Sequence, residues 1–390
     1  MKQKLLIVNS NLYTGGVQKA LAALLANIGN DYDVTLLLFY KGGACLGELP
    51  DNIRVEEVKS AFRYLGMNRS DAKSPKNKLL RAIYAGITRV FGRKYAIALM
   101  GLGQKKLAGF DYAVSYIQNG GDKAFYGGCN EFVAKHVEAG KKISFLHGDY
   151  RLCGANTALN AALYKSFDAI AACSRGCGDS VLAAMPELGD KLHIVKNCQR
   201  YDEIRTRAEK TKIRLEPEKI NIVTVARLGR EKSVGRAVEA MARLGALREK
   251  IHYYIIGDGI EKDRICGIID EAKLGDTVTL CGSMDEPYGY IKAADLLLIP
   301  SLSEAAPMVI GEAACLGTPV LSTETSSAGE MIEDSGYGWV CENSVEGLRN
   351  GLEMLISEPD KLREKSEFLS TLHFDDSEAA GQFKAMLDRL

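Results

Sequence analysis

Short apolar runs alternate along the whole chain with longer segments in which apolar and polar residues are mixed. The runs at residues 5–8 and 220–226 are mostly apolar, as strands buried on both faces are. Residues 17–28 follow the first run, and their apolar positions recur at the three- and four-residue spacing of a helix buried on one side. Strands that alternate with helices in this way are typical of parallel sheets covered by helices. The pattern therefore predicts an α/β fold.

The predicted strands form two series separated by a polar stretch. Residues 199–217 are rich in charge and are predicted to link two domains, the number expected for a chain of 390 residues. Residues 374–390 carry an apolar stripe at helical spacing and are predicted to form a final helix. The first series of strands is predicted at 5–8, 34–39, 113–116, 143–146, 169–172 and 194–195, and the second at 220–226, 252–256, 278–281, 296–299 and 320–322.

Charge and cysteine content exclude several classes of protein. The 50 Lys and Arg residues balance the 50 Asp and Glu residues, so no global field recruits nucleic acid. The chain starts with a predicted strand in place of an apolar signal region, and no apolar run is long enough to span a bilayer. The ten cysteines lack the C-x-x-C spacing of a zinc site and are expected to be small buried side chains in a reducing compartment. These features predict a cytoplasmic location, with peripheral attachment to the inner face of the cell membrane left open.

Two acids lie close to a predicted strand-to-helix junction in the second series. Glu304 follows the strand at 296–299, and Glu312 lies within the apolar stretch after Pro307. Proline suits the first turn of a helix, so the helix is predicted to begin near Ala306. Its first amides favour an anion such as a diphosphate, while the two acids can accept hydrogen bonds from sugar and ribose hydroxyls. Ordinary solvated glutamates are the alternative interpretation of the spacing alone.

Basic and glycine residues follow other predicted strands. Arg227 comes directly after the strand at 220–226 and Lys232 five residues later, where two cations would bind a diphosphate, although a basic surface loop would look the same. Gly15 and Gly16 follow the first strand and would let backbone approach a phosphate, although a glycine pair often only makes a turn. Met284 follows the strand at 278–281 and offers an apolar side chain to a base.

These motifs together resemble the retaining glycosyltransferases of family four over about residues 220–342. The resemblance rests on Val225-Ala226-Arg227-Leu228 with Lys232, Ile256-Gly257-Asp258-Gly259, Leu280-Cys281-Gly282, Ala294-Asp295, Pro300-Ser301 with the Glu304 and Glu312 pair, and Gly317-Thr318-Pro319-Val320. The N-terminal half is similar more loosely, through Gly15-Gly16-Val17, Phe145-Leu146-His147-Gly148-Asp149, Cys173-Ser174 and Lys196-Asn197. The resemblance implies a GT-B fold, in which two Rossmann-like doubly wound domains face one another across a cleft. It places residues 1–198 plus 374–390 in an acceptor-side domain and 199–373 in a nucleotide-sugar-binding domain.

The same resemblance implies a role for each matching residue. Glu304 would contact hydroxyls of the donor sugar, Glu312 would hold the ribose, and His147 would lie near the donor sugar and the acceptor. Arg227 and Lys232 would bind the diphosphate, and Met284 would border the base. The catalytic set would be Glu304, His147, Lys232 and Arg227, and the donor-binding set would add Gly15, Gly16, Met284, Ala305, Ala306, Pro307, Met308, Val309 and Glu312. Many relatives have Gly and an aromatic residue where this chain has Ala305 and Ala306, which leaves the identity of the sugar open.

The implied reaction is retaining transfer of a sugar from a nucleoside diphosphate sugar to a hydroxyl of a saccharide or lipid-linked saccharide, in bacterial capsule or lipopolysaccharide synthesis. Uridine diphosphate sugars are the commonest donors of the family. No Asp-x-Asp pair follows a strand in a metal-ligand setting, so no metal or other cofactor is expected. A non-hydrolysing nucleotide-sugar epimerase and an inactive nucleotide-sugar-binding subunit remain as alternatives. A nicotinamide-dependent dehydrogenase is a third alternative, but it would need a G-x-G-x-x-G pattern after the first strand, which residues 14–19 do not have.

A second feature concerns the partners of the protein. Residues 73–106 contain nine Lys and Arg residues and no Asp or Glu, with apolar and aromatic residues between them. Such a stretch is suited to an anionic membrane surface. An amphipathic helix packed on its own domain is the equally weighted alternative.

Overall fold

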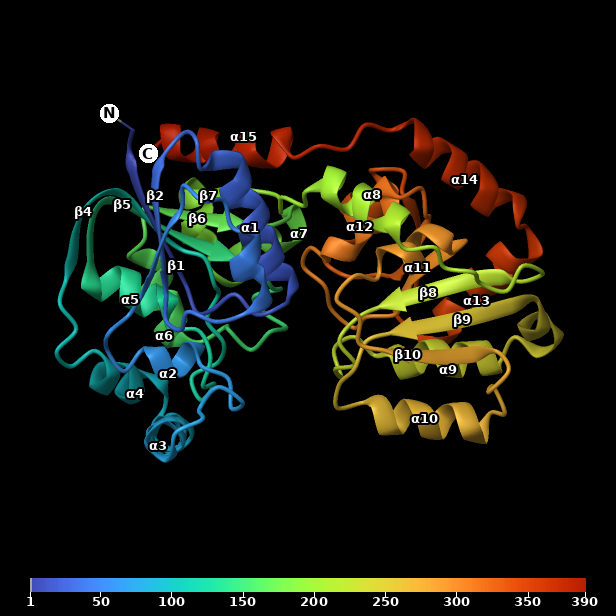
Figure 1. The fold of residues 1–390 in the computed structure, drawn as a ribbon, viewed down its shortest axis with the longest axis horizontal. Coiled ribbons are helices and arrows are strands. Elements are labelled where there is room, and N and C mark those ends of the chain that lie inside the picture. Colours follow the sequence, from blue (N-terminus) through green and yellow to red (C-terminus); the bar gives the residue numbers. More distant parts are fainter. Residues whose placement is uncertain (1) are drawn as a thin grey trace. The chain divides into compact units, whose positions relative to one another are not determined.

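The computed structural model describes residues 2–390, which divide into two compact units. The first unit comprises the residues up to Cys198 together with Asp376–Leu390, and the second comprises Gln199–Asp375. Each unit is described by itself, and the labels follow Figure 1.

The first unit is built on a parallel sheet of seven strands in the order β3-β2-β1-β4-β5-β6-β7. Leu6 of β1 lies beside Thr35 of β2 on one side and Ala113 of β4 on the other. In β1 and β2 every position after the first is buried, as expected for strands covered by helices on both faces, whereas β3 at the edge of the sheet has exposed positions. The strands are β1 (Lys4–Asn9), β2 (Asp33–Leu38), β3 (Arg54–Glu57), β4 (Leu107–Ser115), β5 (Val137–Leu146), β6 (Ala169–Ala172) and β7 (Leu192–Ile194).

The end of the chain belongs to the core of the first unit. Phe383 is fully buried, and its ring lies 6.1 Å from that of Phe145 on β5. Phe374 and Asp375, by contrast, belong to the second unit, where Phe374 packs against Tyr201 and Tyr337. The helices of the first unit are α1 (Gly16–Ile28), η1 (Ala44–Glu48), α2 (Arg63–Gly66), α3 (Pro75–Phe91), α4 (Arg93–Met100), α5 (Cys129–His136), α6 (Ala158–Lys165), α7 (Arg175–Ala184), η2 (Pro186–Lys191) and α15 (Ser377–Asp388).

The second unit contains a parallel sheet of six strands in the order β10-β9-β8-β11-β12-β13. Ile222 and Leu298 pack on one face of this sheet, and Val223 and Leu297 pack on the other. The strands are β8 (Ile220–Val225), β9 (Ile251–Ile256), β10 (Val278–Gly282), β11 (Leu296–Ile299), β12 (Val320–Thr323) and β13 (Gly338–Cys341), and the helices are α8 (Tyr201–Lys210), α9 (Val234–Ala242), η3 (Gly245–Lys250), α10 (Lys262–Glu271), α11 (Tyr288–Ala293), α12 (Met308–Cys315), η4 (Gly329–Glu333), α13 (Val345–Ser357) and α14 (Asp360–Thr371).

The prediction of a linker over residues 199–217 is wrong for most of its length. Residues Tyr201–Lys210 form α8, and Ile204 and Ala208 of this helix are buried in the second core. The sequence suggested a linker because the other positions of the helix are mostly polar, and only a narrow stripe contacts the core.

Both sheets reverse their strand order next to the first strand of the unit. In the second unit, β8 has β9 on one side and β11 on the other, so the loops after β8 and β11 leave the same edge of the sheet. Ligands of doubly wound sheets bind at such a point, because the two loops diverge there. Within residues 2–390, no helix is both long and apolar enough to cross a membrane.

Candidate functional site

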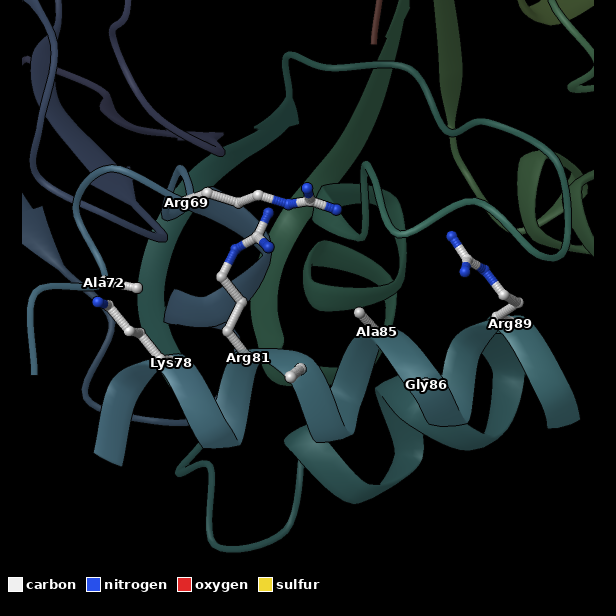
Figure 2. Close-up of a pocket in the computed structure, with 8 residues that line it drawn as sticks. Arg69, Ala72, Lys78, Arg81, Ala85, Gly86 and Arg89 are labelled. Atoms are coloured by element: carbon white, nitrogen blue, oxygen red, sulfur yellow. The ribbon is translucent and has the colours of Figure 1, made fainter. Parts of the chain in front are cut away.

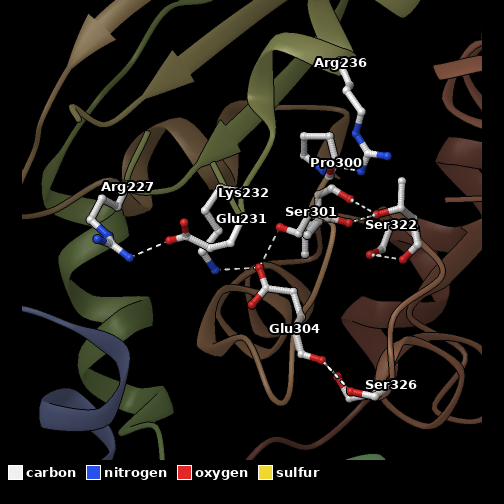
Figure 3. Close-up of polar contacts among 12 residues, drawn as sticks. Arg227, Glu231, Lys232, Arg236, Pro300, Ser301, Glu304, Ser322 and Ser326 are labelled. Atoms are coloured by element: carbon white, nitrogen blue, oxygen red, sulfur yellow. Dashed lines mark hydrogen bonds and ion pairs between the residues drawn. The ribbon is translucent and has the colours of Figure 1, made fainter. Parts of the chain in front are cut away.

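The loops that follow β8 and β11 meet through an ion pair. The Nζ of Lys232 lies 2.5 Å from Oε1 of Glu304, although the two residues are 72 positions apart in the sequence. The Ser301 hydroxyl donates to the same carboxylate oxygen over 2.6 Å (Figure 3). The side chains of Lys232 and Glu304 are 25% and 10% exposed. The carboxylate is thus held by two donors in a largely desolvated position, and the structure brings two of the predicted site residues together.

The loop after β8, which carries Lys232, lies in close backbone contact with the loop after β9. Gly257 has a φ of +149°, and a Cβ built there would lie 1.8 Å from the carbonyl oxygen of Ala226. The Leu228 amide donates to the Asp258 carbonyl over 2.9 Å, which ties the loop after β8 to the loop after β9. The Gly257-Asp258-Gly259 turn therefore acts as a support for the loop with the basic residues, and only glycine fits at position 257.

Arg236 and Asn343 hold the loop that carries Glu304. Arg236 of α9 donates to the Pro300 carbonyl over 2.7 Å and to the Asn343 side-chain oxygen over 2.8 Å. Asn343 in turn donates to the Leu302 carbonyl over 3.2 Å. Sequence reasoning missed both side chains, because an arginine within a helix and an asparagine far downstream carry no local signal. Ser301 was noted in the sequence as part of the Pro300-Ser301 motif after β11, but its hydrogen bond to Glu304 was not predicted.

The helix after Glu304 starts later than predicted. The sequence suggested a start near Ala306, whereas α12 begins at Met308 and Pro307 has an extended ψ of 121°. Proline therefore precedes the first turn here and does not belong to it. The amides of Met308 and Val309 lie in that first turn, where amides have no acceptor within the helix. Glu312 follows one turn later and is only 5% exposed.

The other candidates of the second unit lie around this pair. Arg227 is on the same loop as Lys232, but its side chain is 75% exposed and bonds to Glu231 over 2.5 Å (Figure 3). Met284 follows β10 and is half-buried against the second core. The structure thus gives Lys232 a fixed partner and leaves Arg227 paired at the surface.

Gly15 and Gly16 lie between β1 and α1 in the first unit, and Gly16 is the first residue of the helix. Gly15 has a φ of 179°, which is an extended conformation that any residue adopts. Backbone conformation therefore does not require glycine here. A Cβ at Gly15 would lie 2.7 Å from the flexible end of Gln18, so its absence mainly keeps the start of α1 open.

His147 follows β5 in the first unit and is held by its backbone. The amides of His147 and Gly148 both donate to the side-chain oxygen of Gln118, over 3.0 and 2.9 Å. The imidazole stacks on Phe145 with a centroid distance of 5.6 Å and lies 4.8 Å from the Tyr116 ring. Burial lowers the pKa of His147 to about 4, and the Tyr116 backbone opposes this shift only in part. The imidazole is therefore neutral at physiological pH, and Gln118 is a further residue that sequence reasoning missed.

No group of three or more His, Cys, Asp or Glu side chains within residues 2–390 is arranged to hold a metal ion.

Comparison with known proteins places this geometry in a family. Residues 205–367, which include both loops of the ion pair, match the family model described as glycosyl transferases group 1. The chain carries a group 1 glycosyltransferase domain. Among curated relatives, the amylovoran biosynthesis glycosyltransferase AmsK of Erwinia amylovora is 34% identical over 150 residues, which cover 33% of this chain and 37% of AmsK. The putative colanic acid biosynthesis glycosyltransferase WcaL of Escherichia coli is 33% identical over 144 residues, which cover 34% of this chain and 35% of WcaL. The chain thus spans about a third of the length of these curated relatives.

Solved structures are similar in fold over the whole length of the chain. The structure of Anabaena HepE in complex with UDP is similar with a TM-score of 0.68 at 17% identity and covers 100% of both chains. WaaG, a glycosyltransferase involved in lipopolysaccharide biosynthesis, is similar with a TM-score of 0.59 at 16% identity and covers 98% of both chains. The predicted GT-B fold with two Rossmann-like parallel-sheet domains is thereby confirmed.

Proposed function

We propose that the protein transfers a sugar from a nucleoside diphosphate sugar, with UDP as the nucleotide, to a hydroxyl of a saccharide or lipid-linked saccharide acceptor. The proposed setting is the cytoplasmic synthesis of bacterial cell-surface polysaccharides. The names of AmsK and WcaL support this setting, and the HepE complexes with UDP and with UDP-glucose support the donor. The observation that carries the proposal is the Lys232 and Glu304 ion pair beside the start of α12.

The ion pair makes this end of α12 suitable for a diphosphate. A lone carboxylate at the start of a helix would repel an incoming anion. Lys232 offsets that charge at 2.5 Å, so the amides of the first turn are available to phosphate oxygens. Arg227, which pairs with Glu231 at the surface, is assigned to the phosphates as a second cation that would exchange this partner for them. In the proposed complex, the diphosphate lies against Lys232, Arg227 and the amides of Met308 and Val309.

The remaining candidates are assigned to the other parts of the donor and to the acceptor. Glu304 lies just ahead of the phosphate-binding amides and is assigned to hydroxyls of the donor sugar. Glu312 is assigned to the ribose hydroxyls, and Met284 borders the base. In the first unit, Gly15 and Gly16 are assigned to the donor phosphates, while His147 is assigned to the sugar and the acceptor.

The proposed reaction retains the configuration of the anomeric carbon. The bond from that carbon to the diphosphate oxygen breaks while the acceptor hydroxyl oxygen bonds to the same face, through a state with oxocarbenium character. The departing phosphate oxygen accepts the proton of the acceptor hydroxyl, so atoms and charge balance without a separate base. Lys232 and Arg227 stabilise the charge that develops on the diphosphate. His147 contributes hydrogen bonds as a neutral imidazole, because its pKa is about 4.

In this proposal, Lys232 and Arg227 stabilise the charge of the leaving diphosphate, which a divalent cation does in other enzymes. We therefore expect the same transfer rate after dialysis against EDTA as with added magnesium. A rate that falls in EDTA and returns with magnesium would contradict this part of the proposal.

A two-step experiment on the full chain tests the donor assignment. Thermal unfolding is first measured with UDP-, GDP- and ADP-linked sugars, because a donor that binds only the folded state raises the melting temperature. The sugar that raises it is then supplied with saccharide and lipid-linked saccharide acceptors, and the anomer of the product is read by NMR. A UDP sugar should stabilise the protein and yield a retained product. An inverted product would overturn the mechanism, and epimerisation of the donor or an absence of both stabilisation and transfer would overturn the function.

A further inference from the structure

Helix α3 of the first unit lies largely outside the hydrophobic core. Of its 17 residues, only Thr88 is buried. The helix starts with Pro75 after a Ser74 cap, whose side chain accepts from the Asn77 amide. It is attached mainly along one side, where the Tyr84 ring stacks on Tyr64 of α2 at 5.7 Å. Figure 1 shows α3 beside α2 and α4 at the outer end of this unit. A helix with such a small attached surface has two faces left for other partners.

The exposed part of α3 is divided into a basic face and an apolar face. With 3.6 residues per turn, Lys78, Arg81 and Arg89 fall on one stripe of the helix. Leu79, Ile83 and Val90 fall on another stripe, roughly a third of a turn away. The stripe that contacts α2 lies on the remaining side. Because the basic and the apolar residues lie on different stripes, the two exposed stripes are expected to contact different environments.

A groove runs along the basic stripe and contains no acid. Its volume is about 530 Å³, and Figure 2 shows Arg69 reaching over it from the preceding loop toward Arg81. Within residues 2–390, none of the four cations that line it forms an ion pair with a carboxylate, whereas many other basic residues do, as Lys106 does with Glu138. The lining residues are Arg69, Ala72, Lys78, Arg81, Ala82, Ala85, Gly86 and Arg89.

Two of the cations in the groove, Arg69 and Arg81, lie close together. Arg81 donates from Nε to the Met67 carbonyl over 2.9 Å, and its guanidinium lies 5.4 Å from the centre of the Phe125 ring. Burial lowers the pKa of Arg81, and the charge of Arg69 lowers it further. Like charges kept together without a counter-charge favour binding of an anion, and a phosphate accepts hydrogen bonds from several guanidinium groups at once.

The apolar stripe indicates where this anion comes from. Leu79 is 62% exposed and Val90 is 66% exposed, and the apolar surface continues into α4, where Tyr95 is 61% exposed. Exposed apolar side chains of this size beside basic ones are typical of helices that lie in the interface of a bilayer. A small soluble anion would use the cations and leave the apolar stripe in water.

We infer that α3 and α4 form a membrane-docking surface, in which the groove binds the head-group phosphate of an anionic phospholipid. The apolar stripe would enter the boundary between head groups and acyl chains while Lys78, Arg81 and Arg89 stay at the level of the phosphates. This site lies on the first unit, shares no residue with the set assigned to the donor, and does not depend on the proposed transfer reaction.

Flotation of the full chain with vesicles tests the inference. Phosphatidylcholine vesicles with and without phosphatidylglycerol serve as probes, at low and high salt. We expect binding only to the anionic vesicles, weakened by salt. The triple variant Arg69→Glu, Lys78→Glu, Arg89→Glu should lower the partition coefficient at least roughly tenfold. The three side chains are exposed, so the variant should keep its melting temperature.

Matched variants separate the groove from general charge and general hydrophobicity. Lys212→Glu with Arg214→Glu and Lys250→Glu makes the same charge change at exposed positions of the second unit and should bind like the parent. Leu79→Ser with Val90→Ser should weaken binding, whereas Leu152→Ser with Ile260→Ser, at positions 66% and 79% exposed, should not.

Three outcomes would overturn the inference. The first is an absence of flotation with anionic vesicles. The second is an equal loss of binding in the control charge variant, which would show that net charge alone decides. The third is saturable binding of free pyrophosphate that needs Arg69 and Arg89 while vesicles are not bound, which would assign the groove to a soluble anion.

Discussion

Lys232 and Glu304 form an ion pair of 2.5 Å across two loops that are 72 residues apart in the sequence. They meet because β8 and β11 are neighbours where the strand order of the second sheet reverses. The pair joins a cation that can bind phosphate to a carboxylate that can bind sugar hydroxyls. A bound donor would therefore contact both partners, and removal of either should affect the same step.

Replacement of Lys232 or Glu304 should remove most transfer activity. We expect Lys232→Ala and Glu304→Ala each to lower kcat/KM about 100-fold to 1000-fold, since each removes charge or hydrogen bonding from the site where the leaving group departs. Initial rates with the donor found by thermal shift provide the measurement, and circular dichroism checks the fold.

A double variant and a neighbouring cation control this prediction. Residues that act as a unit give non-additive losses, so the double variant should be little worse than the poorer single one. Arg230→Ala removes a cation from the same loop whose side chain is 85% exposed, and it should retain parental activity. Near-full activity in both single variants would refute the assignment of this site.

Stability should fall at acidic pH in a way that depends on His147. The unfolded chain protonates this residue near its ordinary pKa of 6.5, and the folded chain only near pH 4. Above pH 6.5 both states are neutral and the residue has no effect. As the pH falls from 6.5 to 4, the unfolded state binds the proton first, so the folded state loses up to about 3 kcal/mol.

Urea unfolding across this pH range measures the loss. The variant His147→Phe keeps a ring packed against Tyr116 and Phe145 but cannot bind a proton, so its stability should decline less steeply with acid. Identical slopes for parent and variant would show that the imidazole titrates normally in the folded state.

The loop with Lys232 should depend on glycine at position 257. A methyl group at Gly257 would meet the Ala226 carbonyl oxygen at 1.8 Å, and the φ of +149° is one that other residues rarely adopt. We expect Gly257→Ala to destabilise the protein by about 2–4 kcal/mol and to lower activity, measured by urea unfolding and initial rates. Gly275→Ala, where a Cβ meets nothing within 4 Å, should stay close to the parent in both measurements.

A buried ion pair anchors α4 in the first unit. Arg93, at the start of this helix, lies 3.1 Å from Glu131, and their side chains are 1% and 5% exposed. The variant Glu131→Gln leaves the Arg93 charge buried and uncompensated, and it should cost about 3 kcal/mol of stability. The exposed pair of Lys106 and Glu138 gives the comparison, since Glu138→Gln should cost less than about 1 kcal/mol. Equal losses in the two variants would contradict a structural role for the buried pair.

Much of the fold followed from local pattern. The strands β1 and β8 are apolar on both faces and were found within one or two residues, because burial between two layers of helices leaves a signal in every position. Helix α8 was mistaken for a linker because only Ile204 and Ala208 are buried. The start of α12 was predicted two residues early, because proline is compatible with both the cap position and the first turn of a helix. The ψ of 121° at Pro307 is extended, so here proline lies at the cap.

The candidate site was predicted less completely. Lys232, Glu304 and His147 were named from their positions after strands, and their catalytic roles stay predictions. The side chains that orient them were missed, since Gln118, Arg236 and Asn343 act on backbone groups that are distant in sequence. No local pattern of residues marks such a partner.

The sequence by itself determined which segments become strands, which loops follow them and which of those loops carry charge, because burial and backbone preference act over a few neighbouring residues. Only the tertiary structure decided that Lys232 pairs with Glu304 while Arg227 pairs with Glu231 at the surface. It also decided that the cations of α3 share one groove without a carboxylate. Hydrogen bonds and charges depend on distances in space, and those distances are set by strand order and packing, which no short stretch of the chain specifies.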